Sequence, residues 1–94
     1  MRNESTKALK SEIKELILET LGITDVKLEE INDEKPIFGS DNALTLDSVD
    51  GLEIIMALQR KYHVRIGDQN LSRSIIYSIN SIADFIIVEK NKQN

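Results

Sequence analysis

The sequence has no cysteine and no tryptophan, only one proline and one histidine, and no long hydrophobic run. Without cysteine, the chain offers no disulfide, no thiolate nucleophile and no zinc–sulfur site. No apolar run approaches the roughly 20 residues that a membrane-spanning helix needs, and the first residues lack the apolar region of a signal peptide. We therefore expect a cytoplasmic protein with no membrane span.

Aromatic residues are also scarce, at 4% of the 94 residues, whereas hydrophobic residues together reach 40%. Isoleucine and leucine supply most of that content, so the core is expected to be aliphatic and able to admit an aliphatic guest. The length suffices for one small domain with one core. We expect a single domain over residues 1–94, with its core at residues 7–90 and a polar tail at residues 91–94.

Acidic residues are concentrated in the middle of the chain. The formal net charge is −4, but residues 24–53 carry nine acidic residues against two lysines, whereas residues 54–94 carry six basic residues against three acidic ones. An acidic segment of this kind suggests a basic protein partner and argues against nucleic acid as a ligand. On charge alone, a solvated acidic loop explains the same pattern.

The spacing of apolar residues predicts a first helix over residues 5–21, with lysine and glutamate on its other face. Ser5 or Thr6 is the expected N-cap, and Gly22 is expected to provide the left-handed conformation that ends the helix.

The helical pattern breaks over residues 23–46, where apolar residues are sparse and the only proline occurs. A loop this long is unusual inside a compact domain unless its own side chains anchor it. Residues 28–31 also predict a short helical turn. The expected anchors are Leu28, Ile31, Ile37 and Phe38.

A second helix is predicted over residues 47–62, with Asp47 as its N-cap. Ser48 therefore falls in the first turn, where unpaired backbone N–H groups and the helix dipole favour a phosphate-bearing side chain. Gly51 is unfavourable inside a helix by roughly 1 kcal/mol relative to alanine. Its missing side chain either lets a partner come close or is simply tolerated.

Two further helices complete the prediction. Residues 63–66 alternate like an extended segment that brings Val64 and Ile66 to the core. A short third helix is expected after Gly67, and Ser78 is expected to cap a fourth. The predicted fold class is all-α, a small four-helix bundle of three main helices and one short helix, with a long loop between helices one and two.

Nothing in the chain predicts an enzyme. His63 is the only histidine, and it lies roughly 20 Å along the second helix from Ser48, too far to activate that hydroxyl. Capping accounts for Asp47 and Asp50 without any acid–base role. A calcium loop that starts at Asp41 puts leucine where glycine is required, so no metal site is expected.

What remains is Ser48 and its context. The motif Asp47-Ser48-Val49 follows a long acidic loop at the predicted start of helix two, where the acyl carrier protein family has an Asp-Ser-Leu motif. The chain resembles that family over roughly residues 7–90. The other stretches that carry the resemblance are residues 21–23, 33–39, 52–58 and 78–86.

The resemblance implies a non-catalytic carrier whose Ser48 bears 4′-phosphopantetheine from coenzyme A and holds acyl intermediates as thioesters. It implies as partners a phosphopantetheinyl transferase and acyl-transferring and condensing enzymes with basic docking patches. The implied recognition residues are Asp47, Val49, Asp50, Leu52 and Glu53. The acyl chain is expected to slip between helices. The candidate pocket residues, which ordinary core positions also explain, are Met56, Ile66, Leu71 and Ile75.

The far end of the second helix is basic, with Arg60 and Lys61, whereas carriers of fatty-acid synthesis usually continue with acidic residues there. This departure favours a carrier dedicated to a particular pathway over a housekeeping role in fatty-acid synthesis. The expected cargo is an acyl intermediate of a fatty-acid, polyketide or specialised lipid-like pathway. An aminoacyl, peptidyl or D-alanyl carrier remains open, as does an unmodified helical adaptor whose Ser48 merely starts a helix or is phosphorylated. A monomer is expected.

Overall fold

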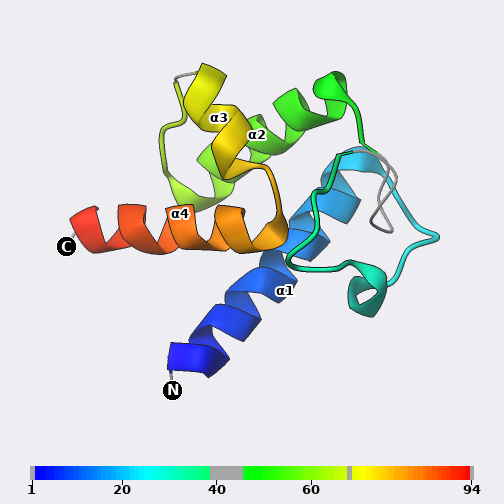
Figure 1. The fold of residues 1–94 in the computed structure, drawn as a ribbon, viewed down its shortest axis with the longest axis horizontal. Helices are drawn as coiled ribbons and strands as arrows, with labels where there is room; N and C mark the ends of the chain where they lie inside the picture. Colours follow the sequence, from blue (N-terminus) through cyan, green and yellow to red (C-terminus); the bar gives the residue numbers. More distant parts are fainter. Residues whose placement is uncertain (1, 39–45, 68, 94) are drawn as a thin grey trace.

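Four helices and one short 3₁₀ turn form the described part of the chain, as Figure 1 shows. The computed structural model describes residues 2–38, 46–67 and 69–93. Among these residues there is no strand, so the predicted all-α bundle of three main helices and one short helix is confirmed. The elements are α1 (Arg2–Leu21), η1 (Leu28–Glu30), α2 (Ser48–Tyr62), α3 (Gln69–Ile75) and α4 (Ile79–Gln93).

The first helix, α1, is the one against which the other main helices pack. It contacts both α2 and α4, while α3 packs on α4, and Figure 1 shows α4 crossing α1. The core between them is aliphatic, as the composition predicted, and each fully buried side chain of this kind contributes roughly 1.5–3 kcal/mol. The largest fully buried side chains are Ile13, Ile17, Ile37, Ile54, Leu58, Ile79, Ile82 and Ile86.

The long loop between α1 and α2 is fastened to helices at several points. The Asp33 carboxylate pairs with Lys14 Nζ of α1 at 2.7 Å, and the Asp33 carbonyl accepts the Asn80 N–H of α4 at 3.0 Å. Ile37 donates its N–H to the Tyr77 carbonyl, also at 3.0 Å. The loop therefore crosses the bundle on fixed supports, which explains how so long a connection is accommodated.

The hydrophobic anchors of this loop are largely those expected. Ile31 and Ile37 are buried, and Phe38 packs half-buried against the core. Leu28, in the η1 turn, is half-buried but does not join the core cluster, whereas Val26, which was not among the expected anchors, packs against the core. The predicted short helical turn is confirmed as η1.

Helix ends follow the sequence signals except at the start of α1. Gly22 has a φ of 67°, the predicted left-handed ending. The prediction that α1 begins near Ser5 or Thr6 is wrong, because the helix starts at Arg2 and both residues lie inside it. Serine and threonine are only slightly unfavourable within a helix, so a potential cap does not oblige the helix to begin there.

The second half of the chain has the two helices that were predicted, but α4 continues to Gln93, through most of the expected polar tail. Ser78 caps α4, since its Oγ accepts the Ser81 N–H at 3.1 Å. Val64 and Ile66 are both buried, and Ile66 donates its N–H to Gln59 Oε1 at 2.8 Å. Within the described residues, none of the helices combines the length and the apolar character that crossing a bilayer requires.

A polar contact at the edge of the core joins α1 to the end of α2. The Tyr62 hydroxyl donates to Glu12 Oε1 at 3.0 Å, and the Tyr62 side chain is buried. Burial raises the pKa of the Tyr62 hydroxyl above its ordinary value, and the hydrogen bond to Glu12 and the charge of that carboxylate raise it further.

We expect Tyr62→Phe to lower the free energy of unfolding by about 1 kcal/mol, because it removes this hydrogen bond and leaves the packing in place. Urea denaturation at neutral pH measures the change. The control is Tyr77→Phe, because Tyr77 is 54% exposed, and we expect its effect to stay within about 0.5 kcal/mol. Equal effects of the two substitutions would contradict the assignment.

The same pair of proteins tests the raised pKa. Because the pKa of Tyr62 is higher in the folded state, the folded state favours the protonated hydroxyl. The stability that this hydroxyl contributes is complete below the unfolded-state pKa of about 10 and is lost as the pH rises above it. The difference in unfolding free energy between wild type and Tyr62→Phe should therefore shrink above about pH 10. A constant or growing difference would contradict a raised pKa.

Candidate functional site

Ser48 is the first residue of α2, and its position is set by the residue before it. Asp47 is the N-cap, as predicted, with its Oδ1 accepting the Asp50 N–H at 3.0 Å. Asp50 Oδ2 in turn accepts the Asp47 N–H at 3.1 Å, which completes a capping box. The Ser48 side chain is exposed in the first helical turn, where backbone N–H groups lack acceptors within the helix.

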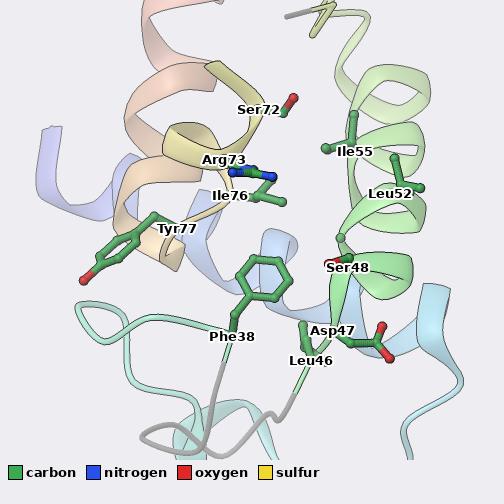
Figure 2. Close-up of a pocket in the computed structure, with 11 residues that line it drawn as sticks. Phe38, Leu46, Asp47, Ser48, Leu52, Ile55, Ser72, Arg73, Ile76 and Tyr77 are labelled. Carbon is green, nitrogen blue, oxygen red and sulfur yellow. The ribbon is translucent and has the colours of Figure 1, made fainter. Parts of the chain in front are cut away.

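A cavity of about 510 Å³ opens beside Ser48, between α2 and α3 (Figure 2). Its apolar lining comes from three parts of the chain: the loop that precedes α2, α2 itself, and α3 with the residues after it. Its polar lining includes Ser48 on one wall and Arg73 on the opposite wall. The described lining residues are Phe38, Leu46, Asp47, Ser48, Gly51, Leu52, Ile55, Ser72, Arg73, Ile76 and Tyr77.

Gly51 is needed where the walls of this cavity meet. A Cβ atom at this buried position would lie 3.1 Å from Phe38 Cζ and 3.2 Å from Ile76 Cδ1. The glycine therefore makes room for side chains of the same chain, whereas the sequence suggested room for a partner or a tolerated defect. Its helix-propensity cost is offset by the close approach of Phe38, from the loop, and of Ile76, which follows α3, to α2.

The four residues expected to line an acyl pocket are placed differently. Ile66 and Ile75 are buried in the main core, and Met56 is 57% exposed. None of these three lines the cavity beside Ser48. Leu71 belongs to α3, and its side chain lies outside the described residues.

The α2 residues that do line the cavity follow a spacing that the sequence contained. Gly51, Leu52 and Ile55 lie three, four and seven residues after Ser48, so they share its side of the helix. Met56 lies one residue further round, toward solvent. Counting from Ser48 along helical spacing would have identified this wall, whereas the contributions of Phe38 and Ile76 depend on tertiary contacts.

The expected recognition residues form the exposed face of α2 next to Ser48. Val49 is 64% exposed and Leu52 is 63% exposed, and Met56 continues the same apolar stripe one turn later. Glu53 is exposed beside them, whereas Asp50 is half-buried through its role in the capping box. Adjacent exposed apolar side chains on one helix face are typical of a surface that a protein partner covers.

No family model matches this chain, and the search of curated proteins returned no match.

Other candidate chemistry lies away from the cavity. His63 follows the last residue of α2, at the opposite end of the helix from Ser48, and it does not line the cavity. Over the described residues, no three His, Asp or Glu side chains gather as a possible metal site. Among the described residues, the candidate for chemistry at the cavity is therefore Ser48, whose exposed hydroxyl lies in the first turn of α2.

We expect Gly51→Val to destabilise the fold by about 1–3 kcal/mol, because the added side chain must displace the Phe38 ring or Ile76. Thermal or urea unfolding measures the loss. The matched control is Gly67→Val, since a Cβ there would meet nothing within 4 Å, and its effect should stay within about 0.5 kcal/mol. A Gly51 variant as stable as the Gly67 variant would contradict the close packing at this wall.

Proposed function

We propose that this protein is an acyl carrier, with 4′-phosphopantetheine attached to Ser48 and cargo held on the thiol of that arm. The observation that carries the proposal is the exposed Ser48 hydroxyl, in the first turn of α2 and on the rim of a largely apolar cavity. A first-turn position suits a phosphodiester, because the helix dipole and the free N–H groups favour negative charge.

The cavity supports the proposal by its size and lining. About 510 Å³ lies within the usual range for small-molecule pockets, roughly 300–1,000 Å³. Apolar side chains such as Phe38, Ile55 and Ile76 line it, so an acyl chain that entered would leave water for an apolar surface. The cavity and the serine share one rim, which suits a cargo tethered to that serine.

The exposed face of α2 supports the proposal that partner enzymes bind this protein next to Ser48. Val49, Leu52 and Met56 present an apolar stripe, and Glu53 adds a carboxylate beside it. Such a face suits enzymes that combine apolar contacts with a basic patch. Arg60 is exposed toward the far end of the same helix, so the preferred partner carries basic groups only opposite the first turns.

In this proposal the protein carries the cargo and other enzymes catalyse its reactions, which fits the residues that the chain contains. When bound, the prosthetic arm supplies the thiol that forms the thioester. The chain itself has no cysteine, and Ser48 has no neighbouring histidine, so the protein's own residues anchor, shelter and present the cargo. The chemistry then belongs to the partner enzymes, and fatty, polyketide or specialised lipid-like acyl groups all fit this role.

Two alternatives fit parts of the same site. An aminoacyl, peptidyl or D-alanyl carrier would use Ser48 in the same way and differ only in its cargo. An unmodified helical adaptor would use the apolar stripe on α2 and leave Ser48 bare or phosphorylated. The carrier is preferred because the adaptor gives no role to the cavity beside Ser48.

Incubation with coenzyme A and a broad-specificity phosphopantetheinyl transferase should add one phosphopantetheinyl group, seen by intact mass. Ser48→Ala should abolish the addition. Ser72→Ala is the matched control, since this serine also lines the cavity but lies on α3, and it should be modified like wild type. No addition to wild type, or addition to Ser48→Ala, would contradict the proposal.

Glu53→Lys should lower the kcat/KM of that transferase on the order of tenfold, because it places a positive charge on the proposed docking face. Initial rates at low substrate concentration, measured with and without added salt, give the effect. Glu29→Lys is the control, as Glu29 is exposed on η1, away from α2. An equal loss for both variants would indicate a general charge effect and contradict docking at Glu53.

A further inference from the structure

Arg73 introduces a positive charge into the wall of the cavity. It lies on α3, and only one other charged residue, Asp47, belongs to the described lining. Figure 2 shows the guanidinium group directed from α3 toward α2, beside Ile76, while the Asp47 carboxylate points away from the cavity. The charge that faces the cavity is therefore positive.

This guanidinium group has no counter-ion within the described part of the chain. Neither of the ion pairs identified there, Lys14 with Asp33 and Lys92 with Glu89, includes Arg73. The Asp47 carboxylate is engaged in the capping box with Asp50. Arg73 is exposed, so water solvates it while the cavity is open.

An acyl chain that fills the cavity would remove part of that water. A plain alkyl chain offers the guanidinium group nothing in exchange, so its entry carries a desolvation cost. A carboxylate at the far end of the chain would accept two parallel hydrogen bonds from the planar guanidinium and restore the lost interaction. Two cargoes of equal length, one with and one without this carboxylate, would therefore differ in the free energy of entering the cavity.

We propose that the cargo is an acyl group with a carboxylate at its far end, and that Arg73 is the residue that selects it. This inference rests on the proposed attachment of cargo through Ser48. In Figure 2 the guanidinium group lies nearer the level of Ile55 than that of Ser48. Ile55 is seven residues from Ser48, or roughly 10 Å along the helix axis. The cation therefore lies away from the phosphodiester on Ser48, and an arm that folds back over the cavity would bring the far end of its cargo to Arg73.

The test loads the full-length protein through a transferase that accepts acylated coenzyme A. The two probes are hexanoyl and adipoyl groups, which have the same chain length and differ in the terminal carboxylate. For wild type, the melting temperature of the adipoyl form should exceed that of the hexanoyl form by about 2–5 °C at low salt. The excess should decrease as salt is added.

Three variants separate Arg73 from a general charge effect. Arg73→Gln should abolish the excess or reverse its sign, and Arg73→Lys should retain part of it, because lysine keeps the charge but loses the planar fork. Arg65→Gln makes the same charge change at an exposed residue outside the cavity, and it should behave like wild type. Because Arg73→Lys keeps the positive charge, comparing the two Arg73 variants shows whether a loss of the adipoyl excess comes from the lost charge or from disturbed folding.

The outcomes distinguish this inference from the proposed function. If no arm is added to Ser48, the carrier proposal itself fails. If both cargoes load but melt alike in wild type and Arg73→Gln, the carrier stands and the selection by Arg73 is overturned. A third outcome is that Arg73→Gln changes the melting temperature of the arm-bearing form relative to the unmodified form, while the adipoyl group adds no further stability. Arg73 would then interact with the phosphodiester and not with a cargo carboxylate, and the inference is again overturned.

Discussion

The reciprocal hydrogen bonds between Asp47 and Asp50 determine where α2 begins, and the rest of the site depends on the position of that first residue. Because the helix starts at Ser48, this hydroxyl occupies the first turn and is exposed. The same register turns Gly51 toward the Phe38 ring and Ile76, and turns Leu52 toward the cavity rim and solvent. A start one residue later would rotate each of these residues by about 100° around the axis.

The loop before α2 supplies one wall of the cavity beside Ser48. Its contacts with α1 and with the start of α4 bring Phe38 to the wall of the cavity, and an isolated bridge joins Phe38 to Leu46 just before the helix. Gly51 then lets the Phe38 ring and Ile76 approach α2 closely. A glycine that weakens the helix locally thus permits the packing of three segments around one cavity.

Most of the fold was predictable from the sequence, because helix periodicity and capping signals are local. The start of α2, its Asp47 cap and the ending at Gly22 all follow from residues within one turn. The cavity was not predictable in the same way. Phe38 and Ile76 are distant in sequence and meet at Gly51 only through the tertiary arrangement. Met56 was expected to line the acyl pocket or the core, from the resemblance to acyl carrier proteins, yet it lies on the exposed face.

The central claim is that Ser48 is an attachment point and not a nucleophile, a phosphorylation site or a bare helix start. The most direct test is mass spectrometry of the chain purified from cells that produce it, with fragmentation of the peptide that contains Ser48. The account predicts a phosphopantetheinyl group on Ser48 in a substantial fraction of molecules. A chain found only unmodified, or with phosphate alone on Ser48, would contradict it.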